Sequence, residues 1–203
     1  TFLKNNSDIK LYTHQKELYT AFRDGRPKLV LYTAPTGSGK TMSPLGLSEG
    51  HKIIFVCAAR HVGLALAKAA ISMQKKIAFA FGCQSADDIR LHFYSAVECI
   101  RDKRSGKVVK VDNSIGDKIE IMICDIASYE YAMLYMCAFN DINDLIMYWD
   151  EPTISMDYDN HEYHGIIAKN WKNNNIPNIV LSSATLPCYD DIEEVVHDFQ
   201  SKF

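Results

Sequence analysis

Ala34-Pro35-Thr36-Gly37-Ser38-Gly39-Lys40-Thr41, directly after the apolar run Leu29-Val30-Leu31-Tyr32, is the stretch of sequence that decides the fold. The apolar run predicts a short buried β-strand, since it is bounded by Pro27 and by the glycines. The strand, the glycine-rich turn and Gly-Lys-Thr together match a phosphate-binding P-loop, with Ala34 in place of the motif's first glycine. The alternative is an ordinary glycine-rich turn before Lys-Thr, and the strand directly before the motif argues against it.

The residue types of this loop suit the binding of a nucleotide. Gly37 and Gly39 let the backbone curl so that several N–H groups point at phosphate oxygens. A helix expected to begin near Lys40 adds the positive end of its dipole. Lys40 supplies an ammonium for the β and γ phosphates, and the Thr41 hydroxyl is a ligand for Mg²⁺. The predicted nucleotide-binding residues of the loop are Pro35, Thr36, Gly37, Ser38, Gly39, Lys40 and Thr41.

Length and composition indicate a single soluble globular domain. The chain has 203 residues, of which 47% are hydrophobic and 23% charged. No apolar run approaches the roughly 20 residues that span a bilayer, and the N-terminus lacks a signal-peptide pattern. Six widely spaced cysteines without a CxxC pair favour free thiols in a reducing intracellular compartment, the cytoplasm or the nucleus, over disulfides or zinc. The net charge of −3 means that any contact with nucleic acid must come from a local patch.

Predicted strands and helices alternate along the chain. This order predicts an α/β fold, with a mostly parallel sheet covered by helices on both faces. The expected strands are 29–32, 52–57, 77–81, 119–124, 145–149 and 178–181, and the expected helices are 10–24, 62–73, a short one around 93–100, 128–139 and a last one around 192–199.

Residues 101–118 are the most polar part of the chain, and we expect them to form an inserted hairpin or a mobile loop. Five basic residues precede Val111 in this segment. They fit either a nucleic-acid patch or a solvated charged surface, and a charge run of this kind is more often the solvated surface.

Two further motifs follow directly after predicted strands, namely Asp150-Glu151-Pro152-Thr153 and Ser183-Ala184-Thr185. Ligands of parallel α/β sheets bind outside the carboxyl ends of the strands, so both motifs and the glycine loop are expected at one edge. There Asp150 would hold Mg²⁺ together with Thr41, and Glu151 would orient and deprotonate the attacking water. An isolated Asp-Glu pair is otherwise a solvated turn, and the P-loop favours the catalytic interpretation.

Two positions are weaker candidates. The Gln15 carboxamide can donate to and accept from an adenine edge, although this stretch alone favours a solvated helix position. Arg60, placed with His61 on the turn after strand 52–57, fits either a contact to a nucleic-acid phosphate or a surface charge.

The three motifs, in this order, resemble motifs I, II and III of the first RecA-like domain of a superfamily 2 helicase, and the resemblance covers essentially the whole chain. It implies an ATP-binding domain in which Lys40 and Thr41 bind phosphate and Mg²⁺, Asp150 binds Mg²⁺ and Glu151 is the catalytic base. Ser183, Ala184 and Thr185 would couple the nucleotide state to movement on DNA or RNA.

The same resemblance assigns the weaker positions. Tyr12-x-x-Gln15 resembles the adenine-reading Q-motif, which reverses the preference for a solvated Gln15. Arg60 falls where motif Ia contacts the nucleic-acid backbone, and Gly82 falls near motif Ib. Motif II reads Asp-Glu-Pro-Thr here and not Asp-Glu-Ala-Asp.

Relatives in this family carry a second RecA-like domain with motifs IV to VI and an arginine finger. The chain ends a short helix after motif III and does not begin with Met. We therefore expect a piece of a longer chain that binds ATP weakly and hydrolyses it barely or not at all by itself, because an arginine finger supplies on the order of 10³–10⁵ in rate. The alternative is a nucleotide-gated nucleic-acid-binding or scaffold protein without unwinding activity. A P-loop kinase or GTPase fits poorly, because the sequence has no guanine-reading Asn-Lys-x-Asp.

Overall fold

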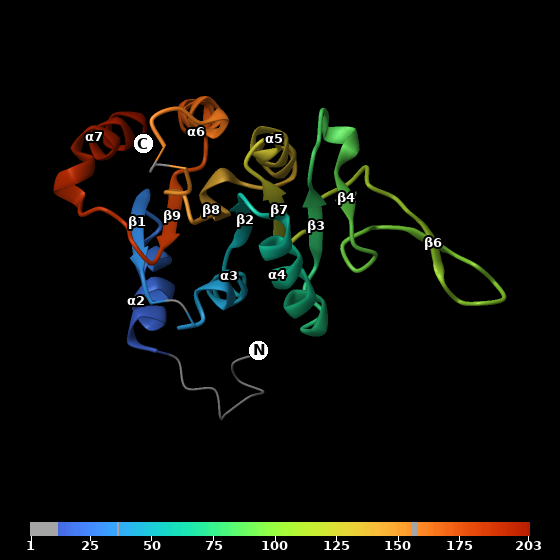
Figure 1. Ribbon diagram of the computed structural model, residues 1–203. Helices are drawn as coiled ribbons and strands as arrows, with labels where there is room; N and C mark the ends of the chain where they lie inside the picture. Colours follow the sequence, from blue (N-terminus) through green and yellow to red (C-terminus); the bar gives the residue numbers. More distant parts are fainter. Residues whose placement is uncertain (1–11, 36, 156–157) are drawn as a thin grey trace.

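The computed structural model describes residues 12–35, 37–155 and 158–203, and its centre is a twisted, mostly parallel β-sheet (Figure 1). Within these residues the sheet has seven strands in the order β1-β9-β8-β2-β7-β3-β4, and only the edge strand β4 is antiparallel to its neighbour. The α/β fold class predicted from the sequence is confirmed. The strands are β1 (Lys28–Thr33), β2 (Lys52–Cys57), β3 (Ile77–Ala80), β4 (Arg90–Leu91), β7 (Ile121–Asp125), β8 (Leu145–Asp150) and β9 (Asn178–Ser183).

Helices cover both faces of this sheet. In Figure 1, α5, α6 and α7 lie along one side of the strands, and α2, α3 and α4 lie along the other. The α-helices are α2 (Thr13–Ala21), α3 (Ser43–Leu47), α4 (Arg60–Ser72), α5 (Tyr129–Phe139), α6 (Glu162–Asn173) and α7 (Glu193–Lys202). Short 3₁₀ helices are η1 (Phe22–Asp24), η2 (Lys40–Met42), η3 (Ala86–Asp88), η4 (Ile142–Asp144) and η5 (Tyr189–Ile192).

The core is divided by the sheet into two layers. Strand β2 shows why, because successive side chains of a strand point to opposite faces. Ile53 and Phe55 pack in the layer under α2, α3 and α4, and Ile54 and Val56 pack in the layer under α5 and α7. All four side chains are fully buried. The continuous apolar run of β2 is therefore the pattern of a strand covered on both faces.

The register of the central strands places the sequence motifs side by side. Thr33 at the end of β1 is level with Ser183 at the end of β9, and Asp150 at the end of β8 is level with Ser182. The P-loop and the two strand-end motifs thus leave adjacent strands at the same edge of the sheet.

Several boundaries differ from those predicted. The first helix begins at Thr13, and positions 10 and 11 lie outside the described residues. The helix at Lys40 begins with the 3₁₀ turn η2, and the five-residue helix α3 follows. Arg60 is the first residue of α4 and not part of the turn before it. Helix α6 has no counterpart among the predicted elements.

The helix predicted around residues 93–100 is wrong. The Ser95 hydroxyl and the His92 N–H both donate to the Ile77 carbonyl, which ties this segment to β3 as a continuation of the antiparallel edge. Val97 and Ile100, expected on a buried helix face, are exposed. Local hydrogen bonds to the sheet therefore prevail over the helical spacing of the apolar residues.

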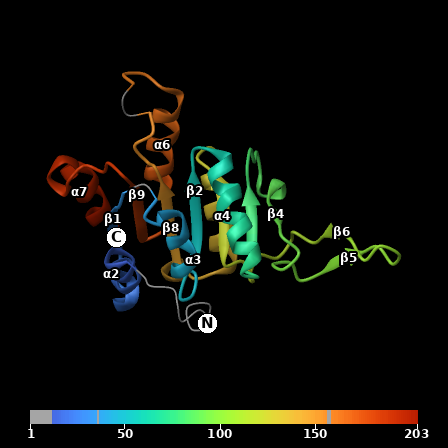
Figure 2. The same cartoon turned by 60° about the horizontal axis from the view of Figure 1, so that its bottom comes forward.

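The segment expected to form an inserted hairpin or a mobile loop, residues 101–118, overlaps a hairpin that begins earlier, at Cys99, and ends at Val111. Strands β5 (Cys99–Arg101) and β6 (Val108–Val111) form a separate antiparallel pair. Figures 1 and 2 show this pair standing out from the β4 edge of the sheet. The six cysteines are free thiols. None of the helices in the described part of the chain combines the length and the apolar character that a membrane crossing requires.

Candidate functional site

The P-loop lysine, the strand-end carboxylates and the Ser-Ala-Thr motif meet at the carboxyl edge of the sheet. Lys40 Nζ lies 3.5 Å from Glu151 Oε1. On the other side of the same carboxylate, Ser183 Oγ donates a 2.5 Å hydrogen bond to Glu151 Oε2. One residue from each of the three motifs thus takes part in a single chain of contacts.

Lys40 is the unusual member of this group. Lys40 is only 8% exposed. Its Nζ has no hydrogen-bond partner in the described part of the chain, although the Glu151 carboxylate lies near it. A buried ammonium is costly unless it is paired and hydrogen-bonded. The contact with Glu151 is long, and the Glu151 side chain is half-exposed, so this ion pair is weak. The position is suited to an additional anion.

Asp150 adds a second carboxylate next to Glu151. It is 9% exposed, and burial together with the neighbouring Glu151 charge raises its pKa from 3.8 to about 6, against the opposing effect of Lys40. Two carboxylates thus share a single ammonium at this edge. A bound cation would reduce the electrostatic repulsion between them.

The donor set fits a magnesium ion bound together with phosphate. Within the described residues, no group of three or more His, Cys, Asp or Glu side chains could hold a metal alone. Mg²⁺ is usually held by one or two protein groups and completes its octahedron with water and phosphate oxygens. Asp150 is one such protein group. Thr41, the other predicted ligand, follows Lys40 directly in η2.

The loop backbone has the conformation that its glycines permit. Gly37 and Gly39 have φ angles of +81° and +82°, a region that residues with a Cβ rarely adopt. Ser38 Oγ donates to the Pro35 carbonyl over 2.6 Å and closes the turn. Thr36, predicted to bind nucleotide, lies outside the described residues.

Glu151 also departs from ordinary backbone geometry. Its φ is +53°, and its N–H donates to the Ser182 carbonyl over 2.7 Å. A non-glycine residue in the left-handed region costs about 1–2 kcal/mol, and such strain persists where the surrounding structure imposes it. Here β9 imposes it, because Ser182 holds the Glu151 backbone and Ser183 holds its side chain.

The rest of the Ser-Ala-Thr motif continues this contact. The Thr185 N–H donates to Ser183 Oγ over 3.3 Å, and Thr153 Oγ1 lies 3.5 Å from the same oxygen. Ala184 is half-buried and Thr185 is exposed. Ser183 is thus the point at which the motif after β9 meets the motif after β8.

Sequence reasoning missed Tyr148. Its hydroxyl lies 3.2 Å from the Lys40 carbonyl and 3.0 Å from Ser182 Oγ, and burial raises its pKa well above the ordinary value. Tyr148, which lies on β8, thus joins the P-loop to β9. The available signal was a hydroxyl-bearing side chain inside an otherwise apolar strand, two residues before Asp150, which demands a buried polar partner.

Gln15 lies against the P-loop. The residue is 6% exposed, which excludes a solvated helix position. Its Oε1 accepts from the Tyr12 N–H over 3.2 Å, and its Nε2 donates to the Gly39 carbonyl over a long 3.5 Å. Each end of the carboxamide keeps one further hydrogen-bonding position. A role in reading adenine stays a prediction.

Arg60 and Gly82 lie at the same edge of the sheet but farther along it, at the ends of β2 and β3. The exposed Arg60 guanidinium stands 5.1 Å above the centre of the Phe81 ring. Gly82 has a φ of +64°, and its N–H donates to Asp125 Oδ2 over 2.7 Å. The structure does not bring these two residues to the Lys40 site, and their contact with nucleic acid remains a prediction.

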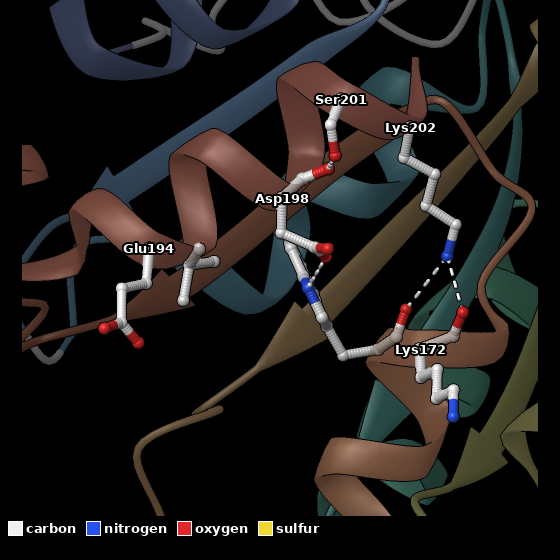
Figure 3. A pocket seen from close by; sticks show the side chains of 7 residues that line it. Lys172, Glu194, Asp198, Ser201 and Lys202 are labelled. Carbon is white, nitrogen blue, oxygen red and sulfur yellow. Dashed lines mark hydrogen bonds between the residues drawn. The ribbon is translucent and has the colours of Figure 1, made fainter.

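A cavity of about 550 Å³ lies between α6 and α7 and takes no part in this site (Figure 3). There the Lys202 ammonium donates to the Trp171 and Lys172 carbonyls and closes the end of α6. Trp171 Nε1 donates to Asp198 over 2.7 Å. These contacts join the two helices, and no motif residue lines the cavity.

Comparisons with known proteins bear on the fold. No family model matches the sequence, and no curated protein matches it. Solved structures do. One, described as a hypothetical ATP-dependent RNA helicase from Sulfolobus tokodaii, superimposes on 99% of this chain. Its TM-score is 0.56 and its sequence identity is 18%. A DEAD box protein from Methanococcus jannaschii is similar to 97% of it, with a TM-score of 0.58 at 17% identity.

The fold is RecA-like. The helicase domain of Hef from Pyrococcus furiosus gives the same result, with 97% of this chain covered, a TM-score of 0.55 and 15% identity. Identities this low show the RecA-like fold alone. This chain spans 54%, 49% and 38% of those three structures, about half their length or less.

Proposed function

We propose that this chain is the ATP-binding domain of an ATP-dependent nucleic-acid helicase or translocase. The observation that carries the proposal is the buried Lys40 ammonium, which lacks a hydrogen-bond partner among the described residues and lies beside the carboxylate of Glu151 at a strand end. The RecA-like fold supports it, because the matching structures bear the descriptions of helicases and a DEAD box protein.

Each residue of the site has a role in this proposal. Lys40 and the backbone of Pro35–Thr41 hold the β and γ phosphates of ATP, and Asp150 and Thr41 hold Mg²⁺. When bound, Mg²⁺ neutralises charge on the phosphate oxygens. Glu151 accepts a proton from the water that attacks the γ-phosphorus, as the bond from that phosphorus to the ADP oxygen breaks.

The contact between Ser183 and Glu151 is the proposed coupling device. A displacement of the segment Ser183–Thr185 would change the hydrogen bond that orients the Glu151 carboxylate, because Ser183 Oγ donates directly to Glu151 Oε2. Movement of nucleic acid or of a second domain against this segment would thereby alter the position of the base. The reverse also holds, since a change at Glu151 moves Ser183.

The remaining parts of the proposal concern partners. Arg60 and Gly82 are proposed contacts to the backbone of DNA or RNA, and Gln15 to the adenine ring. A second RecA-like domain in a longer chain would supply the arginine finger, and the half-length coverage of the similar structures supports this view. The free thiols support a reducing compartment, the cytoplasm or nucleus.

The test is ATP turnover by the longer chain that contains this domain, with and without single-stranded and duplex DNA and RNA. Glu151→Gln should bind ATP and lose turnover by about 10²–10⁴-fold, the usual contribution of a general base. Glu17→Gln, at an exposed position of α2, is the matched control and should leave both ATP binding and turnover unchanged. Stimulation by one nucleic acid would support a motor and identify its substrate. Turnover that ignores every nucleic acid, or that survives Glu151→Gln, would contradict the proposal and favour a scaffold.

A further inference from the structure

The insertion, residues 101–118, differs in charge from the rest of the chain. It contains six basic and three acidic residues and therefore carries +3, whereas the whole chain carries −3. The remaining 185 residues must then carry −6. A positive segment on a negative body is a charge asymmetry that attracts anionic partners to that segment alone.

The base of the insertion is fixed to the body. The Leu91 N–H in β4 donates to Asn113 Oδ1 over 2.8 Å, and the Tyr135 hydroxyl in α5 donates to the Asn113 carbonyl over 2.8 Å. Gly116 packs so closely on the Tyr135 ring that an added Cβ would lie 2.3 Å from it. These contacts set the direction in which the hairpin leaves the sheet edge.

The far end of the hairpin is free of the body. Figures 1 and 2 show β6 and the turn before it projecting from the molecule. Lys103, Arg104 and Lys107 in this turn are exposed, and within the described residues none of them forms a salt bridge. The one acidic residue of the turn, Asp102, accepts hydrogen bonds from Ser105 Oγ and from backbone N–H groups. Its carboxylate thus shapes the turn and neutralises none of these cations directly.

Aromatic rings lie beside a fourth cation of the hairpin, Arg101 at the end of β5. The Arg101 guanidinium stands 5.3 Å from the centre of the Phe93 ring, and the exposed Tyr94 ring lies 4.3 Å from that of Phe93. Ile100 and Val109 on the hairpin are 61% and 69% exposed, so the arm also presents apolar surface. The arm therefore combines exposed cations at its turn with rings beside Arg101, of which Tyr94 is exposed. Proteins hold single-stranded nucleic acid with such a combination, through phosphate contacts and base stacking.

We propose that the β5–β6 hairpin and the adjoining Phe93 and Tyr94 are a second nucleic-acid contact, which binds a single strand outside the sheet edge. This inference rests on the proposed function and deepens it, since it assigns part of the partner to the insertion. An isolated two-stranded hairpin is only marginally stable in water, and a bound strand would stabilise it. The rings favour nucleic acid over an acidic protein as the occupant.

The test is the binding of fluorescein-labelled dT20 and U20 to the 203-residue chain, measured by anisotropy over a series of salt concentrations. The variant Lys103→Ala/Arg104→Ala/Lys107→Ala removes the three cations of the turn. The matched control Arg23→Ala/Lys68→Ala/Lys172→Ala removes three exposed cations elsewhere and changes the net charge equally. Phe93→Leu/Tyr94→Leu probes stacking at unchanged charge, and binding of a fluorescent ATP analogue is measured separately on every variant.

The turn variant should weaken binding at low salt and reduce the slope of log affinity against log salt by about 2, since each phosphate contact to a single strand contributes about 0.7. The aromatic variant should weaken binding and leave the slope unchanged. Equal losses in the control, or affinity equal to that of the wild-type chain in the turn variant, would overturn the proposal. So would a wild-type chain that binds neither strand. Failure of the ATP site would appear in the analogue titration alone, so the two proposals fail separately.

Discussion

Asp150→Asn is predicted to stabilise the fold at neutral pH, because the wild-type side chain carries a charge that its surroundings disfavour. Burial and the neighbouring Glu151 raise the Asp150 pKa from 3.8 to about 6. Asparagine has nearly the same shape and no charge. A shift of roughly 2 pKa units corresponds to about 3 kcal/mol of unfolding free energy at most.

The pH dependence identifies the cause. Below about pH 4 the carboxyl is protonated in both the folded and the unfolded chain, so wild type and variant should be equally stable. Between about pH 4 and pH 6 the unfolded chain releases the proton while the folded chain retains it, so wild-type stability falls as the pH rises. Above pH 6 the difference should stay constant at its full size.

Urea unfolding from pH 4 to pH 8 measures this difference without nucleotide or magnesium. Asp159→Asn, at an exposed position, is the control and should leave the free energy of unfolding nearly unchanged throughout. A variant that is less stable than wild type at pH 7, or one whose gain is the same at pH 4 and pH 8, would refute the reasoning. Asp150, the proposed Mg²⁺ ligand, would then be retained at the expense of stability.

Three further substitutions test the contacts around the site, two by stability and one by ligand binding. Gly46→Ala should destabilise the chain by about 1–3 kcal/mol in thermal unfolding, because the new Cβ would lie 2.3 Å from the Tyr19 ring, while Gly50→Ala meets open space and should have little effect. Tyr148→Phe should cost about 1–2 kcal/mol in urea unfolding, since it removes the hydroxyl between Lys40 and Ser182; an unchanged midpoint would contradict that contact. Gln15→Ala should weaken binding of ATP more than that of inorganic triphosphate, and equal losses would argue against an adenine contact.

The sheet was predictable from the sequence because most of its strands are short apolar runs, several of which end in candidate site residues. Strand β2 was predicted with its observed bounds, since a strand buried on both faces leaves a continuous apolar pattern. The meeting of Lys40, Glu151 and Ser183 followed from one topological rule, that parallel strands present their carboxyl ends at the same edge.

The failures have local physical causes. Helix α6 carries polar residues through much of its length and packs against the core through a few apolar side chains such as Ile167 and Trp171. Its apolar residues share one face, but they are too few to make the segment stand out in the sequence as an apolar run. The segment after β4 has helical spacing of its apolar residues, but hydrogen bonds to Ile77 determine its structure. Tyr148 was missed because its role depends on the Lys40 carbonyl, 108 residues away in the chain.

The most direct test of the central claim is the binding of ATP with Mg²⁺ to the 203-residue chain, measured by titration calorimetry. The account predicts binding to one site, which Lys40→Ala abolishes and which Glu151→Gln retains. Lys16→Ala, at an exposed position of α2, should bind as the wild-type chain does. A chain that does not bind ATP, or that binds it equally well after Lys40→Ala, would contradict the claim that this edge of the sheet is an ATP site.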